Sequence, residues 1–172
     1  MSKVIHKSWY TAAAGRAGAR PAVEYDFEGL FSEGSLEGTM FAGRIRFDEA
    51  AVPSEQHVSF ALYEGRRSPV VTMVVGGHVM AASGAAVYDS VFDGTAKHYD
   101  FVTMYGTGPV NGIPDGAYFE LYFADQDGAT LDGTHMPTAQ QLCDMPVKQV
   151  SFGSSAPGDV LSVGTMHLIA AH

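Results

Sequence analysis

Apolar and polar residues alternate along segment 23–48 in the way that a half-buried hairpin requires. Val23, Tyr25 and Phe27 fall on every second position, and acidic residues stand between them. A period of two predicts a strand that buries one face and exposes the other. The alternation resumes in residues 41–47 after a Ser-Glu-Gly turn. Two strands cannot bury their apolar faces alone, so the hairpin predicts a second layer of sheet.

The same alternation recurs along the rest of the chain at hairpin-like spacing. Residues 70–80 form one continuous apolar run, which predicts a single strand buried on both faces with a bulge or bend at Gly76-Gly77. Residues 138–142 lie between Pro137 and Pro146 and predict one helical turn. The other expected strands cover residues 57–63, 87–92, 98–105, 118–124, 147–152 and 160–170.

These elements predict an all-β fold. We expect a single-domain antiparallel β-sandwich or flattened β-barrel of about 8–10 strands. Residues 23–172 would form this domain. Residues 1–22 would add one N-terminal strand, over residues 4–10, and a loop of small and basic residues.

Charge and composition narrow the range of partners. The net charge of −9 argues against nucleic acid and anionic membranes, because both are themselves negative. Cys143 is the single cysteine, so it has no partner for an internal disulfide. No apolar run reaches the ~18 residues of a spanning helix, and no signal-peptide core is apparent. As given, the sequence predicts a soluble, cytoplasmic protein, or an exported one if a signal peptide was removed.

Three passages resemble a known group of proteins. Residues 34–48, GSLEGTMFAGRIRFD, resemble the G-x-L-x-G-T-x-F-x-G-x-F-x-Y-D hairpin of bacterial exported β-sandwich domains of the PEP-CTERM type. Residues 119–142 are similar to their later strand, turn and L-P-x-x-L-x-L passage, and residues 161–168 to their closing strand. Neither a signal peptide nor a sorting tail accompanies these passages. The resemblance implies a β-sandwich and no fixed catalytic residues.

Familiar catalytic motifs do not occur in the sequence. The nucleophile elbow G-x-S-x-G and the glycine-rich phosphate loops are absent, and the seven histidines never stand at H-x-H or H-x-x-x-H spacing. We therefore expect no cofactor, and a non-enzymatic binding module for a small molecule, a glycan or a protein partner. The alternative is a cofactor-independent cyclase, isomerase or lyase that works in an aromatic-lined β-barrel pocket.

Two expected strands carry the residues that best fit a ligand site. In strand 118–124 the alternation places Phe119, Leu121 and Phe123 in the core and the polar residues on the other face. In strand 98–105 one face carries Tyr99, Phe101 and Thr103, and the other carries His98, Asp100 and Val102. If the strands are neighbours, one polar and aromatic face would combine His98, Asp100, Tyr118, Glu120 and Tyr122. Such a set could bind a sugar by stacking and hydrogen bonds, or supply a general acid and base. It could equally be the solvated face of a sandwich.

Two further hypotheses concern ions and self-association. Asp125, Asp127 and Asp132 surround Gly128 and offer carboxylates of the kind that calcium prefers, although Asp-Gly turns are common in hairpins. Strands with few charges also leave edges that an isologous homodimer would cover. Residues 70–75 and 160–170 are the candidate edges or interfaces.

Overall fold

The computed structural model describes residues 22–65, 68–91, 98–107, 118–153 and 160–170. The described strands form one antiparallel sheet in the order β3-β4-β7-β8-β9-β10-β11-β1-β2-β5-β6. This confirms the all-β prediction. Its elements are β1 (Val23–Gly34), β2 (Met40–Phe47), β3 (Glu55–Gln56), β4 (Phe60–Tyr63), β5 (Val70–Val75), β6 (His78–Ser83), β7 (Ala85–Val91), β8 (His98–Thr107), β9 (Tyr118–Asp125), α1 (Ala139–Asp144), β10 (Val147–Gly153) and β11 (Val160–Ala170).

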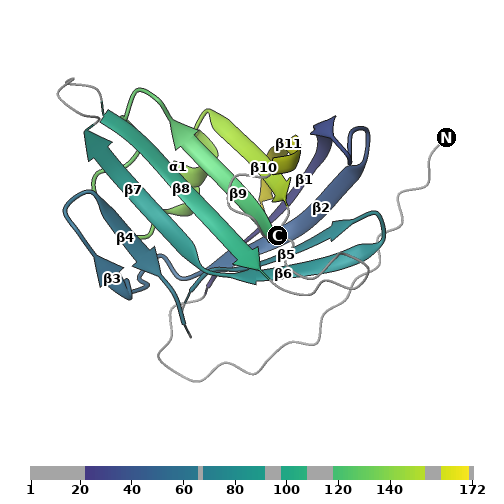
Figure 1. Ribbon diagram of the computed structural model, residues 1–172. Helices are drawn as coiled ribbons and strands as arrows, with labels where there is room; N and C mark the ends of the chain where they lie inside the picture. The colour runs from purple at the N-terminus through teal and green to yellow at the C-terminus, as the bar shows by residue number, and fades with distance from the viewer. Residues whose placement is uncertain (1–21, 66–67, 92–97, 108–117, 154–159, 171–172) are drawn as a thin grey trace.

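The sheet curls into a half-barrel, so that β6 at one end of the strand order meets β8 near the other (Figure 1). Only Gly84 separates β6 from β7, and the chain bends there from one end of the sheet to the other. The N–H of Gly84 donates to the carbonyl oxygen of Pro69 at 3.2 Å, and the N–H of Tyr105 donates to that of Gly84 at 3.4 Å. These bonds hold the two ends of the sheet together.

The inner face of the half-barrel is filled by apolar side chains. Alternate residues of each strand point inward and are buried, as the period of two predicts. The largest fully buried side chains are Tyr63, Phe27, Phe31, Phe41, Phe119, Phe123, Ile45, Met73, Met80, Met104, Leu121 and Met136. This core leaves the remaining face of each strand as the outer surface.

Glycines in the central strands make room for the phenylalanine rings of the core. Phe27 lies directly opposite Gly43, and Phe41 lies directly opposite Gly29. A Cβ atom added to Gly43 would stand 2.4 Å from Cζ of Phe27, and one added to Gly29 would stand equally close to Cζ of Phe41. Each ring therefore covers the glycine of the neighbouring strand, and a larger residue could not occupy either position without moving it.

The segment between β9 and β10 packs against the inner face and contains α1. The predicted helical turn is confirmed there. The N–H of Thr138 donates to Oε1 of Gln141 at 2.8 Å, and the N–H of Gln141 donates to Oγ1 of Thr138 at 3.2 Å, which is a capping box. Tyr63 anchors the same segment, because its hydroxyl donates to the carbonyl oxygen of Thr134 at 2.9 Å. None of the helices in the described part of the chain has the length and apolar character that crossing a membrane demands.

The continuous apolar run 70–80 is two strands, so the prediction of one doubly buried strand is wrong. β5 and β6 pair as a hairpin across Gly76-Gly77, whose φ angles of 55° and 86° are both positive. Two positive φ angles suit the tight turns that join antiparallel strands. Each strand buries only one face, and Val74 and Val79 on the other face are exposed.

The two predicted edges lie inside the sheet. β5 pairs with β2 and β6, and β11 pairs with β10 and β1. Neither strand therefore has a free backbone edge that a second copy could extend, and the edge prediction is wrong. The homodimer itself stays a prediction. The predicted N-terminal strand, residues 4–10, falls outside the described residues.

Candidate functional site

The candidate site lies on β8 and β9, which are neighbouring strands, as the predicted face required. Their register sets Thr103 opposite Tyr122, Tyr105 opposite Glu120, and Asp100 opposite Asp125. Directly opposed residues point to the same side of a sheet. Tyr122 and Glu120 therefore share the outer face with the odd-numbered residues of β8.

The predicted combination of Asp100 with Glu120 and Tyr122 is wrong. Asp100 points to the inner face together with Val102, and it is fully buried. In the observed register the even-numbered residues of β8 stand opposite odd-numbered residues of β9, so Asp100 shares its face with Asp125 and not with Glu120 or Tyr122. The side chains of His98 and Tyr118 lie outside the described part of the chain. Of the five predicted residues, Glu120 and Tyr122 lie on the outer face in the part of the chain that the structure describes.

The structure instead assembles a polar and aromatic outer surface from both strands. Tyr122 is flanked by Thr103 of β8 and Gln149 of β10, and its hydroxyl hydrogen-bonds that of Tyr99. Glu120 is flanked by Tyr105 of β8 and Ser151 of β10. We call this surface the polar–aromatic face, and it consists of Tyr99, Phe101, Thr103, Tyr105, Glu120 and Tyr122.

Three titratable groups of the polar–aromatic face are perturbed in the same direction. Partial burial raises the pKa of Glu120 above its usual value. Partial burial, with the hydrogen bond to Tyr99 and the charge of Glu120, raises the pKa of Tyr122. The pKa of Tyr105 is raised by partial burial and by Glu64, whose carboxylate accepts its hydroxyl at 3.2 Å. Perturbed groups gathered in one place are typical of functional sites, although structural networks also produce them.

A row of stacked rings extends from this face toward β4. The centroids of Phe101 and Tyr88 are 4.1 Å apart with 13° between the planes, and those of Tyr88 and Phe60 are 5.6 Å apart with 23°. His57 continues the stack at 4.3 Å from Phe60. Rings stacked in this way use their faces on one another, so they present mainly edges and hydroxyls to a ligand. No local sequence pattern predicts this row, because its members become neighbours only through strand pairing.

The inner carboxylates have a structural role. Oδ2 of Asp100 accepts the N–H groups of Thr130 and Leu131 at 3.0 and 2.7 Å, which ties the loop after β9 to β8. Burial, with the neighbouring Asp89 and Asp125, raises the pKa of Asp100 despite these bonds. Asp125 accepts the hydroxyl of Thr130 at 2.7 Å, and this bond leads those that lower its pKa.

The predicted calcium ligands do not converge. Besides Thr130, Asp125 accepts the N–H groups of Asp127 and Ala129 in an Asp-Gly turn. Asp132 instead lies 3.2 Å from the imidazole of His135. Within the described ranges no group of three or more histidine, cysteine or acidic side chains is placed to hold a metal ion. Calcium binding through Asp125, Asp127 and Asp132 stays a prediction without geometric support.

No protein-family model matches the chain, and no curated protein or solved structure matches it significantly. The resemblance to PEP-CTERM-type domains therefore stays a prediction.

Proposed function

We propose that this protein is a binding module that recognises a glycan or another small hydroxylated molecule on its polar–aromatic face. The observation that carries the proposal is the gathering of Glu120, Tyr122 and Tyr105 on one outer face, each partly buried and each with a raised pKa. The hydrophobic core is on the other face of the same strands, so packing of the fold does not require polar groups here.

Recognition would depend on hydrogen bonds more than on broad stacking. The face offers hydroxyl groups from Tyr99, Tyr122 and Thr103, and oxygens from Glu120. Such groups can both donate to and accept from sugar hydroxyls. Because Phe101 is already stacked on Tyr88, its ring contributes an apolar edge to the surface.

A glycan array followed by calorimetry on the full chain tests this proposal. Glu120→Gln should weaken binding of any ligand found by about tenfold, since charge-assisted hydrogen bonds contribute roughly 1.5–3 kcal/mol. Glu33→Gln removes the same charge from an exposed position on β1 and should leave binding unchanged. Absence of any ligand from the array and from a thermal-shift screen would argue against the proposal, as would equal affinities of the two variants.

Catalysis without a cofactor is the second candidate, and the perturbed Glu120 favours it. A carboxyl group whose pKa is raised by partial burial can hold its proton closer to neutral pH and act as a general acid. A Glu120→Gln variant that keeps ligand affinity but loses turnover would support this role. Turnover that persists in this variant would exclude Glu120 as the acid.

A further inference from the structure

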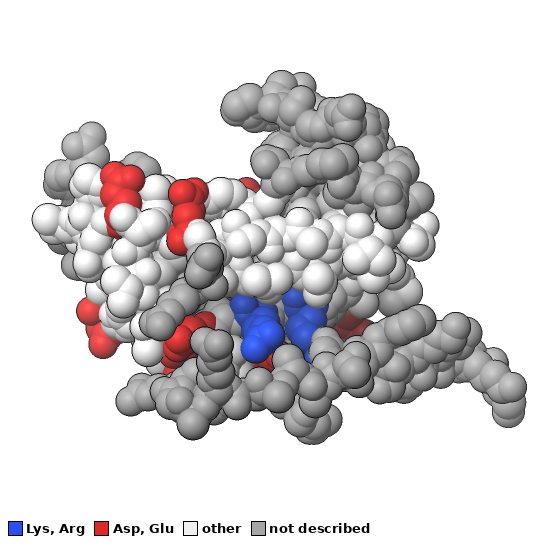
Figure 2. Space-filling view, turned by 90° about the horizontal axis from the view of Figure 1, so that it is seen from below, with Lys and Arg blue, Asp and Glu red and all other residues white. Residues whose placement is uncertain are grey.

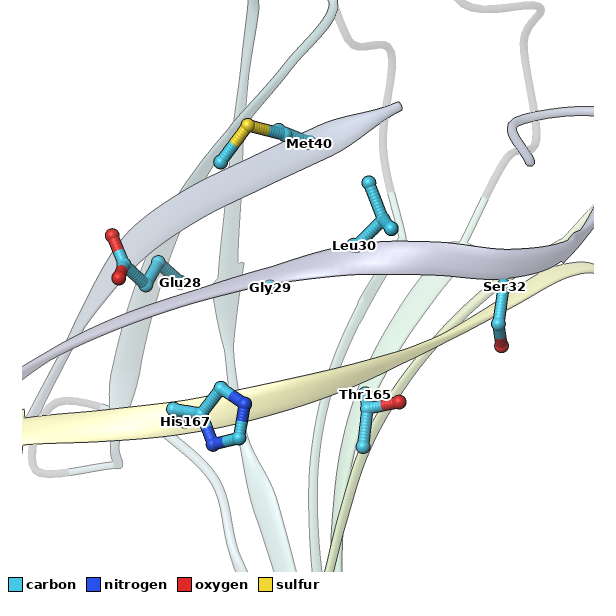
Figure 3. A pocket seen from close by; sticks show the side chains of 7 residues that line it. All are labelled: Glu28, Gly29, Leu30, Ser32, Met40, Thr165 and His167. Atoms are coloured by element: carbon cyan, nitrogen blue, oxygen red, sulfur yellow. The ribbon is translucent and has the colours of Figure 1, made fainter. Parts of the chain in front are cut away.

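A groove lies on the outer face of the sheet where β11, β1 and β2 run side by side (Figure 3). Its volume is about 430 Å³, within the range of small-molecule sites. Leu30 and Met40 lie directly opposite each other in it and are 48% and 68% exposed. The full lining consists of Glu28, Gly29, Leu30, Ser32, Met40, Thr165 and His167. We call it the outer groove.

Two acidic residues of β1 that precede the outer groove are each paired with an arginine of β2. Along the outer face of β1, Glu24 stands opposite Arg46 and Asp26 stands opposite Arg44. Both pairs are ion pairs: Nε of Arg44 is 2.5 Å from Oδ1 of Asp26, and Nε of Arg46 is 3.5 Å from Oε1 of Glu24. The acids of β1 therefore form a regular ladder with the arginines of β2.

The ladder stops at the outer groove. The next acid of β1 on this face is Glu28, and the residue opposite it on β2 is Ala42. On the β11 side, Glu28 stands opposite His167. The carboxylate of Glu28 makes no ion pair or hydrogen bond with the part of the chain that the structure describes. It is thus a negative group at the rim of an apolar groove without the cation that its two predecessors have.

Figure 2 shows basic side chains gathered beside a broad uncharged area of the surface. In the described part of the chain, Val70, Val74 and Val79 of β5 and β6 are large exposed apolar residues. Val74 stands opposite Ala42, the residue that breaks the ladder. Toward Met40 and Val74 the surface beside Glu28 is therefore apolar, and Arg44 bounds it on the other side of Ala42.

We propose that the outer groove binds a small amphipathic cation, with an ammonium group at Glu28 and a short apolar body against Leu30 and Met40. The ammonium group pairs with Glu28 as Arg46 pairs with Glu24 and Arg44 pairs with Asp26. An anionic head group is disfavoured by Glu28 and by the net charge of −9. The hydroxyls of Ser32 and Thr165 lie along the groove and add acceptors for a second donor of the ligand.

Calorimetry on the full chain with three eight-carbon amphiphiles below their micellar concentrations tests the proposal. Octylammonium, octanoate and octyl glucoside share one tail and differ in the charge of the head group. At a pH of about 8, where an ordinary imidazole is neutral, we expect octylammonium to bind at least about tenfold more tightly than the other two. Equal affinities, or tighter binding of octanoate, would overturn the proposal, and so would the absence of octylammonium binding.

Two variants locate the site, and one serves as the control. Glu28→Gln removes the charge, and Ala42→Arg supplies the missing cation from the chain itself, so each should reduce octylammonium affinity about tenfold or more. Glu33→Gln makes the same charge change on β1 outside the groove and should bind like the wild-type protein. Circular dichroism confirms folding of each variant. Unchanged binding in both Glu28→Gln and Ala42→Arg would overturn the assignment to this groove.

Discussion

Asp100 and Glu120 show at the residue scale how side-chain direction determines what a carboxyl group does. Both lie on the neighbouring strands β8 and β9, but Asp100 points inward and Glu120 points outward. Asp100 is fully buried and anchors a loop through two backbone N–H groups. Glu120 is half-buried beside tyrosines. The same chemical group therefore anchors a loop on one face and remains accessible at the surface on the other.

Truncations at adjacent residues of β9 should differ in cost. Phe123→Ala should lower the free energy of unfolding by about 3–5 kcal/mol, because the ring is fully buried. Tyr122→Ala should cost about 1–2 kcal/mol, since the ring is only partly buried but contacts Phe101 and hydrogen-bonds Tyr99. Urea denaturation measures both. An equal or reversed order would contradict the register of β9.

The stability of the protein should depend on pH through Glu120. Its pKa is raised in the folded state, so the folded state holds the proton more tightly than the unfolded state. Tighter proton binding at Glu120 therefore contributes stability to the folded state. This contribution is fully present below the unfolded pKa of about 4.3 and is lost as pH rises through the folded pKa. The melting temperature of Glu120→Gln relative to the wild-type protein should therefore increase from pH 4 to pH 8. A difference in melting temperature between the two proteins that stays constant across this range would contradict a raised pKa of Glu120 in the folded state.

At the element scale, glycines have two different functions in this sheet. Gly29 and Gly43 leave space for the rings of Phe41 and Phe27 inside the paired strands β1 and β2. Gly76 and Gly77 instead supply the positive φ angles of the turn between β5 and β6. The first function is steric and the second is conformational, and substitution should reveal the difference.

Gly29→Ala should cost more stability than Gly77→Ala. A Cβ atom at Gly29 would stand 2.1 Å from the carbonyl oxygen of Thr165, so backbone would have to move, and we expect a loss of about 3 kcal/mol or more. At Gly77 an added Cβ meets nothing within 4 Å, so the cost is the positive φ angle alone, about 1–2 kcal/mol. Equilibrium unfolding in urea compares the two variants. A larger loss for Gly77→Ala would contradict the close packing of β1 against β11.

At the scale of the whole molecule, the contact between β6 and β8 closes the curled sheet. Gly106 of β8 lies against Ala82 of β6, where an added Cβ would come within 2.3 Å of the alanine Cβ. The bend at Gly84 brings the two strands to this contact. The half-barrel therefore depends on small residues at the place where its ends meet.

Gly106→Ala should destabilise the protein by about 1–3 kcal/mol, as overpacking of a close contact does. The loss should be accompanied by faster hydrogen exchange at the N–H groups of Gly84 and Tyr105, whose bonds hold the closure. Ala61→Gly, at a buried position on β4, serves as a control for a change of one methyl group away from the closure. Unaltered exchange at Gly84 and Tyr105 would contradict a closing role for this contact.

Local pattern was sufficient for most of the strands and for part of the site. The alternation in residues 118–124 correctly placed Phe119, Leu121 and Phe123 in the core, with Glu120 and Tyr122 on the other face. The alternation in residues 98–105 was also correct within its strand. The error arose between the strands, because the sequence pattern of each strand leaves open which residues face one another across the pair.

The sequence by itself determined the all-β class, the positions of nearly all strands, the helical turn of residues 138–142, the alternation within β8 and β9, and the inward direction of Phe119, Leu121 and Phe123. These properties depend on residues close together in the chain. Only the tertiary structure decided that residues 70–80 turn back as a hairpin, that Asp100 leaves the outer face, and that Glu28, Met40 and His167 line one groove. β11 pairs with β1 although more than a hundred residues separate them. Such pairings follow from the combined burial of the whole core, which no local pattern contains.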